Sequence, residues 1–254
     1  MKTRILTAIA IVLVVFPPLF FGGWLLQLLA VFIVATASYE FLHALDGYER
    51  WGWPITLVMI LWVLGLGVIP EVWSLAYWIA AAIFFWSLPV FFASISEQDA
   101  LSMVAFAAIL GLCYQSIQLL IPQYHYLWTL CFATYGSDTG AYFAGRFFGK
   151  HKMNERISPK KTWEGFFGGW AGGFVLSFAM SFLYGASLDP MVNLSICLLA
   201  PVFAELGDLC FSAYKREHHL KDFSNILPGH GGILDRVDSL LMNILLFGIL
   251  ITVL

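Results

Sequence analysis

Residues 72–93 read VWSLAYWIAAAIFFWSLPVFFA, a stretch with no charged side chain. The hydrocarbon core of a bilayer is about 30 Å thick, and a helix needs roughly 20 apolar residues to cross it. Outward from this stretch, charged or turn-forming residues bound eight further runs that are mostly apolar. They are 5–21, 24–44, 53–69, 101–121, 126–145, 165–185, 191–211 and 237–254. We therefore predict an all-α, polytopic integral membrane protein with about nine transmembrane helices.

The composition excludes an ordinary soluble domain. Of the 254 residues, 60% are hydrophobic and 11% are charged, whereas soluble domains carry about 25% charged residues. The mean hydropathy is +0.82, which a single buried core does not explain, because a soluble protein covers its surface with polar groups. The cysteines lie in apolar runs without a C-x-x-C pair, so we expect small core residues rather than a disulfide framework or zinc site. They are Cys113, Cys131, Cys197 and Cys210.

The positive charges predict an orientation. With nine spans and a cytoplasmic N-terminus, the inside segments are 1–4, 45–52, 94–100, 146–164 and 212–236, and they contain all 13 Lys and Arg residues. The outside segments have only Glu71 and Asp189 as charged residues. Because cytoplasmic loops are enriched in Lys and Arg, we place the C-terminus outside. We expect about five N-terminal helices in residues 1–125, and a catalytic region in residues 126–254 with cytoplasmic loops 146–164 and 212–236.

The loop 146–164 holds six Lys or Arg residues against Glu155 and Glu164. One interpretation is an orientation signal that also attracts anionic lipid headgroups, at about 1 kcal/mol per basic residue. The other is a polyphosphate site, in which lysines act as point charges and hydroxyls donate hydrogen bonds. The following helix N-terminus would favour an anion. The candidate phosphate ligands are Ser158, Lys160, Lys161 and Thr162.

Acidic residues occur where lipid is expected. Glu205 and Asp208 interrupt an apolar run, and Asp138 lies in another. A carboxylate in the bilayer centre costs several kcal/mol, so it usually faces a cavity and has a partner. Helical rise puts Asp138 and Asp208 at similar depths, with Asp235 and Asp238 at the mouth of the last run. Carboxylates holding Mg²⁺ among cations that hold phosphates are typical of a nucleoside triphosphate site. A proton or cation pathway is the alternative, and the cationic loops favour the nucleotide.

Glycines mark two further features. In residues 228–232, PGHGG, they form either a tight re-entry before the last run or a backbone that approaches a phosphate closely, with His230 as a donor. The run 165–185 carries small residues at a spacing of four, which predicts close helix packing. These are Gly165, Gly168, Gly169, Gly172 and Gly173.

Residues 212–238, SAYKREHHLKDFSNILPGHGGILDRVD, resemble the signature of the phosphatidate cytidylyltransferase family, also called CDP-diacylglycerol synthases. The runs DTGAYFAGRFFGKHK from Asp138, ISPKKTWEG from Ile157 and GDL at 207–209 resemble the same family. The resemblance implies transfer of CMP from CTP to phosphatidate, giving CDP-diacylglycerol and pyrophosphate in phospholipid biosynthesis. It implies a magnesium cofactor (Mg2+), allows a second cation, and places the active site on the cytoplasmic face of the cell inner membrane.

On this resemblance we assign roles. The expected catalytic residues are Asp208, Lys215, Asp235 and Asp238, and the expected metal ligands are Asp138, Asp208, Asp235 and Asp238. The expected substrate-binding residues are Ser158, Lys160, Lys161, Thr162, Ser212, Arg216, Lys221, Asp222, His230 and Arg236. The expected partners are CTP, phosphatidate and the lipid bilayer, with no nucleic acid; a homodimer is allowed. The alternatives are a related CTP-dependent lipid kinase, a cytidylyltransferase of another lipid phosphate, and a cation- or proton-coupled transporter.

Overall fold

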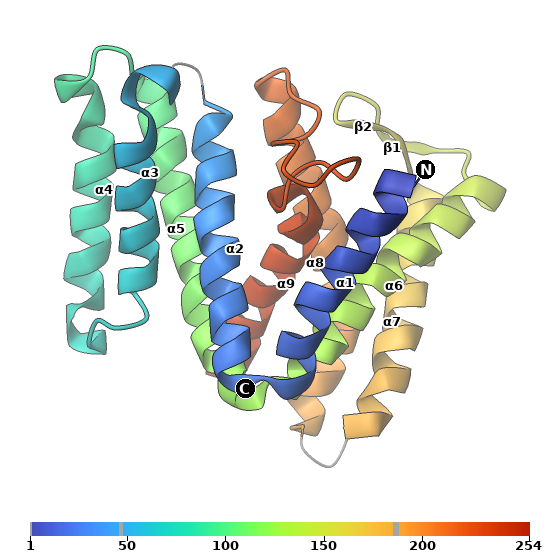
Figure 1. The fold of residues 1–254 in the computed structure, drawn as a ribbon. Helices are drawn as coiled ribbons and strands as arrows, with labels where there is room; N and C mark the ends of the chain where they lie inside the picture. Colours follow the sequence, from blue (N-terminus) through green and yellow to red (C-terminus); the bar gives the residue numbers. More distant parts are fainter. Residues whose placement is uncertain (1, 46–47, 185–187) are drawn as a thin grey trace.

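The computed structural model describes residues 2–45, 48–184 and 188–254. The side chains of the N-terminal basic residues Lys2 and Arg4, and the predicted end of one run at residue 185, lie outside this part. The described chain is all-α apart from one small hairpin. Each of the nine predicted apolar runs corresponds to an α-helix in the described residues, so the helical fold class is confirmed (Figure 1).

The elements follow one another with short connections. The helices are α1 (Lys2–Phe21), α2 (Gly23–His43), α3 (Tyr48–Gly65), α4 (Ser74–Phe91), α5 (Glu97–Leu120), α6 (His125–Phe148), α7 (Trp163–Tyr184), α8 (Pro190–Glu217) and α9 (Leu234–Val253). Two 3₁₀ turns, Glu71–Trp73 and Ile121–Gln123, precede α4 and α6. The strands β1 (Lys152–Asn154) and β2 (Ser158–Thr162) pair antiparallel between α6 and α7.

Six helical segments of the described chain are long and apolar enough to cross a membrane. These are Gly23–His43, Glu71–Phe91, Glu97–Gln123, Trp163–Leu183, Pro190–Glu217 and Leu234–Val253. In α1, the stretch Leu6–Phe21 is a shorter apolar helix. The helix α3 is interrupted at Gly52, whose φ of 34° is outside the helical region. The structure therefore has the character of a polytopic membrane protein.

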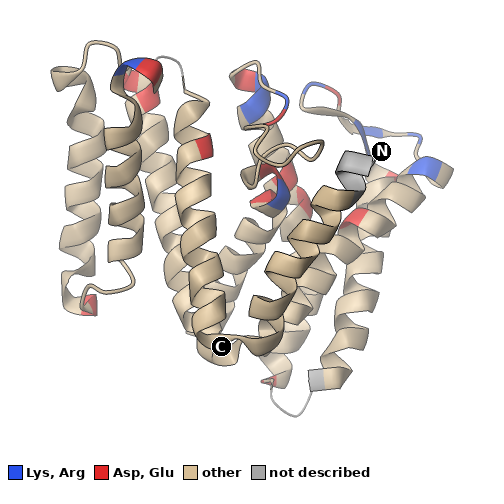
Figure 2. Cartoon of the chain, viewed as in Figure 1, with Lys and Arg blue, Asp and Glu red and all other residues tan. Residues whose placement is uncertain are grey.

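The charged residues gather at one end of the helices. Figure 2 shows most of the blue and red segments at this end, on the hairpin, the loop before α9 and the adjoining helix termini. The helix α1 begins at this charged end, and α9 finishes at the opposite end (Figure 1). The separation agrees with the segregation of charge that the sequence predicts.

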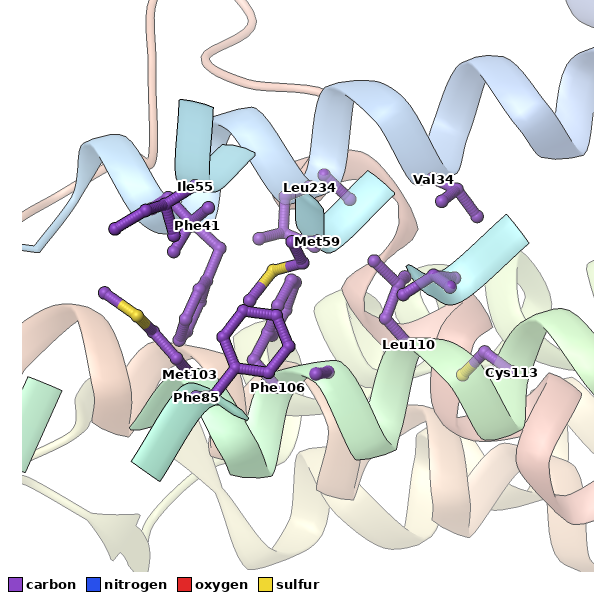
Figure 3. Close-up of a cluster of buried hydrophobic side chains, with 14 of the residues drawn as sticks. Val34, Phe41, Ile55, Met59, Phe85, Met103, Phe106, Leu110, Cys113 and Leu234 are labelled. Carbon is purple, nitrogen blue, oxygen red and sulfur yellow. The ribbon is translucent and has the colours of Figure 1, made fainter. Parts of the chain in front are cut away.

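Two clusters of buried apolar side chains hold the helices together, and α9 contributes to both. The first joins α2, α3, α4 and α5 to α9, with Phe41 stacked on Phe106 at a centroid distance of 3.8 Å (Figure 3). The second joins α2, α6 and α8 to α9 around Tyr126 and Phe247. Because α9 lies between the N-terminal and C-terminal helices, its first turn is reached from both halves of the chain.

Glycines bring α6 and α7 into close contact. A Cβ on Gly140 would meet the carbonyl oxygen of Gly168 at 2.5 Å, and one on Gly173 would meet the carbonyl oxygen of Ala133 at 2.6 Å. The predicted close packing of this glycine-rich helix is thereby confirmed. The expectation for the cysteines holds for three of them but is wrong for Cys210, which is exposed on α8.

The predicted loop 146–164 contains regular structure that its sequence does not predict. Helix α6 continues to Phe148, and the strands β1 and β2 follow it. Lys152 Nζ donates to the carbonyl of Pro159 at 2.6 Å, and the backbone N–H of Trp163 donates to the carbonyl of His151 at 2.9 Å. These bonds fix the hairpin at the entrance to α7, so the lysines of β2 have defined positions.

Candidate functional site

A polar cavity of about 500 Å³ lies at the charged end, between α6, the hairpin, α7 and α8. Asp138 and Arg146 of α6 line it, with Asp208 of α8. From β2, Lys160, Lys161 and Thr162 complete its polar wall. The cavity therefore brings together, from segments far apart in sequence, two of the predicted metal ligands and three of the predicted phosphate ligands.

Lys161 is the central cation of this cavity. Its Nζ lies 2.5 Å from Glu205 Oε2 and 2.5 Å from Asp208 Oδ2. Burial lowers the pKa of Lys161, whereas the charges of Asp208 and Glu205 and their hydrogen bonds to its ammonium raise it. The second effect is larger, so the pKa of Lys161 lies above its ordinary value. Lys161 therefore remains charged and compensates Glu205, whose side chain is only 5% exposed.

Thr162 has a structural task beside the cavity. It is buried, and its Oγ1 accepts a hydrogen bond from the backbone N–H of Gly165 at 3.1 Å. This bond satisfies one of the free N–H groups in the first turn of α7. The Thr162 hydroxyl therefore connects the hairpin to the start of α7. Lys160, by contrast, is exposed and lines the cavity, so its charge is accessible.

A second ion pair lies two helical turns along α8 from Asp208. Lys215 Nζ is 2.6 Å from Asp235 Oδ1, and both side chains are less than 10% exposed. Oδ2 of Asp235 accepts the backbone N–H of Phe223 at 2.8 Å and that of Gly232 at 3.0 Å. The ammonium of Lys215 also lies 5.4 Å from the centroid of the Phe223 ring. Both oxygens of Asp235 thus hold protein donors, and its role as a metal ligand stays a prediction.

Asp238 and Ser212 lie near Asp208 at the contact of α8 with α9. Asp238 is buried, and its Oδ1 accepts the N–H of Ser239 at 2.7 Å. The two helices approach closely here, because a Cβ on Gly207 would lie 2.9 Å from the carbonyl oxygen of Asp238. Ser212 Oγ is 3.5 Å from Asp208 Oδ1. Asp238 therefore lies at the same contact of α8 with α9 as Asp208, but it does not line the polar cavity.

Other predicted residues lie outside this cluster. Arg216 donates to the carbonyl of Leu220 at 2.9 Å, and Arg236 donates through Nε to the carbonyl of His230 at 2.9 Å. His230 is half-buried, and within the described part of the chain its Nδ1 has no hydrogen-bond partner.

Two predicted substrate ligands, Lys221 and Asp222, are exposed at the start of the loop. Ser158 opens β2 and does not line the polar cavity.

Glu40 of α2 is a polar residue near this end of the molecule that is not among the predicted site residues. This side chain is completely buried, and its carboxylate accepts hydrogen bonds from Ser224, Ile233 and Leu234, which lie on either side of the glycine-rich segment 228–232. A single acid within a long apolar run was the signal, and it is the same signal that identified Glu205 and Asp208.

An apolar cavity of about 530 Å³ lies between α1, α2, α6 and α9. Its walls are aliphatic and aromatic side chains such as Val14, Leu29 and Phe132. Arg236 and Tyr135 also line it, and Tyr135 is three residues before Asp138 on α6. The apolar cavity reaches the charged end at Arg236, and nearby residues of α6, Tyr135 and Asp138, line the apolar and the polar cavity respectively.

The arrangement of acids is open rather than cage-like. Among the residues that the structure describes, no group of three His, Cys, Asp or Glu side chains is arranged to hold a metal ion. Mg²⁺ usually keeps several waters and binds through one or two carboxylates together with substrate phosphates. The carboxylate oxygens of Asp138 and Asp208, in one cavity with Lys160 and Lys161, fit that manner of binding.

Comparison with known proteins connects this geometry to a family. The profile described as the cytidylyltransferase family matches residues 2–254. The chain belongs to this family. It is 33% identical to phosphatidate cytidylyltransferases of Staphylococcus haemolyticus and Staphylococcus aureus, and 32% identical to that of Staphylococcus epidermidis. Each of these similarities covers 99% of both chains.

The cavity chemistry agrees with an enzyme of the cytidylyltransferase family. Such an enzyme moves a nucleotidyl group, so it has to align phosphates and neutralise the charge that develops on them. Lys160, Lys161 and Arg146 offer positive charge in one cavity. The resemblance noted from the sequence motifs is thus confirmed over the full chain, including the N-terminal helices that contain Glu40.

Proposed function

We propose that this protein transfers CMP from CTP to phosphatidate, producing CDP-diacylglycerol and pyrophosphate for phospholipid biosynthesis. The observation that carries the proposal is the match over 99% of the chain to proteins named phosphatidate cytidylyltransferase. The two cavities support it, because one is lined by cations and carboxylates and the other by apolar side chains. A water-soluble nucleotide and a lipid phosphate require these two kinds of surroundings at neighbouring places.

The proposed reaction is a phosphoryl-type displacement. An oxygen of the lipid phosphate forms a bond to the α-phosphorus of CTP, the bond from that phosphorus to the bridging oxygen breaks, and pyrophosphate leaves. Phosphatidate is already anionic at neutral pH, so no strong general base is required. Lys160 and Lys161 hold CTP phosphates in the polar cavity, and Lys215 supplies a further cation along α8. The chain's main contribution is alignment of two polyanions.

We propose Asp138 and Asp208 as the residues that hold Mg²⁺ together with the nucleotide. Both line the polar cavity, and carboxylate oxygens are the ligands that this ion prefers. When bound, the ion would neutralise negative charge on the leaving pyrophosphate. We also propose Asp235 and Asp238 as metal ligands, although they do not line the polar cavity. A second cation remains part of the proposal.

The apolar cavity is proposed to receive acyl chains of phosphatidate. Its walls are nearly all hydrocarbon, and burial of each methylene group gains about 0.8 kcal/mol. Arg236 lines this cavity and is exposed. A guanidinium at such a place suits the phosphate of a lipid whose tails lie among α1, α2, α6 and α9.

We also propose a topology with nine membrane crossings, a cytoplasmic N-terminus and an outside C-terminus. All 13 Lys and Arg residues then fall on the cytoplasmic side, as basic loops require. The active site lies on the cytoplasmic face of the cell inner membrane, where CTP is available. Residues 1–125 form the first part of the protein and residues 126–254 the catalytic part.

The test is pyrophosphate release by the purified protein in detergent–lipid micelles containing phosphatidate and CTP. We expect release that depends on both substrates and stops when EDTA removes divalent cations. Release of CDP in place of pyrophosphate would identify a lipid kinase, and a preference for another lipid phosphate would identify a different cytidylyltransferase. Cation flux in liposomes without dependence on CTP would contradict both enzymatic readings.

A further inference from the structure

Glu40 is the one acid of the apolar helix α2, in its last turn, and it is completely buried. Its Oε1 accepts a hydrogen bond from Ser224 Oγ at 2.6 Å and one from the backbone N–H of Ile233 at 2.9 Å. Its Oε2 accepts the backbone N–H of Leu234 at 2.6 Å. A buried carboxylate is costly unless it is hydrogen-bonded, and here three donors satisfy it.

The partners of Glu40 lie at both ends of one loop. Ser224 is the second residue of the loop 223–233, which forms the later part of the connection from α8 to α9, whereas Ile233 and Leu234 lie where this loop ends and α9 begins. The bonds join residues 184 to 194 positions apart in sequence. The backbone N–H groups of Ile233 and Leu234 have no acceptor within α9 and lie at the positive end of its dipole, where a carboxylate is stabilising. Glu40 therefore closes the loop 223–233 against α2.

The same loop holds the second ion pair of the site. Asp235 Oδ2 accepts the N–H groups of Phe223 and Gly232, and its Oδ1 binds Lys215 Nζ. The carboxylates of Glu40 and Asp235 thus accept hydrogen bonds from neighbouring residues of the same loop. A Cβ on Gly232 would lie 2.7 Å from Glu40 Oε1, so the loop backbone lies directly against the Glu40 carboxylate. A shift of Glu40 has to move the donors that orient Asp235.

We infer that Glu40 is a positioning residue for the proposed cytidylyl transfer, which this inference takes as its basis. It acts through the loop 223–233 on Lys215, whose ammonium is held by Asp235. It also acts on Arg236, whose guanidinium is held by the carbonyl of His230 in the same loop. The N-terminal helices therefore contribute to catalysis by fixing the loop, and not only by anchoring the protein in lipid.

The first experiment compares Glu40→Gln with Ser38→Ala in the full-length protein. Gln keeps the size of the side chain but presents an NH₂ group to a backbone N–H. Ser38 is a matched control, because it is also completely buried on α2 and, within the described residues, its Oγ has no hydrogen-bond partner. We expect Glu40→Gln to lower kcat about ten- to hundredfold, as loss of a charge-assisted hydrogen bond does, while Ser38→Ala stays near the wild-type rate.

Hydrogen exchange separates positioning from general destabilisation. In Glu40→Gln we expect faster amide exchange confined to residues 223–235, with α5 protected as in the wild type. Faster exchange throughout α2, α5 and α9, with kcat per folded molecule unchanged, would overturn the inference and make Glu40 a fold residue only. Local loss of protection with a normal kcat would overturn it as well, because the loop would then not matter for turnover.

Gly232→Ala and Ser224→Ala provide a second route if Glu40→Gln does not fold. The methyl group of Gly232→Ala displaces the Glu40 carboxylate without removing it, and Ser224→Ala deletes one of its three donors. We expect both to lower kcat, Gly232→Ala more strongly, with exchange increased in the same loop. Unchanged kcat in both contradicts the inference. A wild-type protein without pyrophosphate release contradicts the proposed function instead, and exchange in the variants still reports whether Glu40 holds the loop.

Discussion

At the scale of single residues, Lys161 and Lys160 are neighbours with different tasks. Lys161 is held between Glu205 and Asp208, whereas Lys160 is exposed at the cavity wall. Exposed ion pairs contribute little to stability, but removing one partner of a buried pair leaves an uncompensated charge. We therefore expect substitutions of the two lysines to separate the stability of the cavity from its proposed affinity for phosphate.

We expect Lys161→Met to destabilise the protein by about 3–5 kcal/mol, because Glu205 would be left buried without its cation. Turnover should fall as well. Lys160→Met should keep the wild-type unfolding temperature and raise the KM for CTP. Thermal unfolding in detergent and initial rates of pyrophosphate release measure both effects. Equal stability of the two variants would show that the ion pairs of Lys161 do not compensate Glu205.

Asp208 and Asp235 also differ at this scale. We expect Asp208→Asn to reduce turnover by about two orders of magnitude or more, because it removes a charge that the proposed function places at the reacting phosphates. Its effect on stability should be small, since Lys161 keeps Glu205 as a partner. Glu71→Gln is the control, because Glu71 is exposed and lies in a predicted outside segment. Near-normal activity of Asp208→Asn would remove Asp208 from the reaction centre.

Asp235→Asn should instead loosen the loop. The variant removes the negative charge that pairs with Lys215. Its new NH₂ group faces either the Lys215 ammonium or the backbone N–H groups of Phe223 and Gly232, and in both orientations a donor meets a donor. We expect a loss of stability of about 3–5 kcal/mol, with faster hydrogen exchange in residues 223–233. Normal exchange there together with lost activity would favour the sequence prediction that Asp235 binds a metal ion directly.

At the scale of elements, the contact between α6 and α7 sets the position of Asp138. The glycines on both helices let the backbones approach closely, and Gly140 lies two positions after Asp138. A helix pair without glycines at these places would be further apart. The cavity wall that carries Asp138 would then move away from the hairpin and from Lys161.

We expect Gly140→Ala to destabilise the protein by about 1–3 kcal/mol, the usual cost of overpacking, and to lower turnover. The added methyl would meet the backbone carbonyl of Gly168, which has no rotamer with which to move aside. Gly145→Ala is the milder comparison, because its methyl would lie 3.3 Å from the Thr162 side chain. If both variants unfold at the wild-type temperature, the close approach of α6 and α7 is not required.

At the scale of the whole molecule, the sequence predicted nine helices and the gathering of charge at one end, because apolar run length and charge position determine both. Which side chains pair with one another was harder to predict from the sequence. The pairing of Lys161 with Glu205 joins two residues 44 positions apart, and only the tertiary fold brings the Lys161 side chain of β2 to α8. The hairpin was missed because its strands are short and basic. Glu40 was missed because its donors belong to a loop at the other end of the chain.

The orientation of the molecule can be tested with cysteine labelling. In a Cys210→Ser background, which removes the one exposed native cysteine of the described residues, a membrane-impermeant thiol reagent is added to spheroplasts. We expect the Glu71→Cys variant to be labelled from outside and the Glu155→Cys variant to be labelled only after lysis. Both positions are exposed, so the difference reports the side of the membrane. Labelling of Glu155→Cys in intact spheroplasts would place the hairpin, and with it the cation-lined cavity, on the side where CTP is absent.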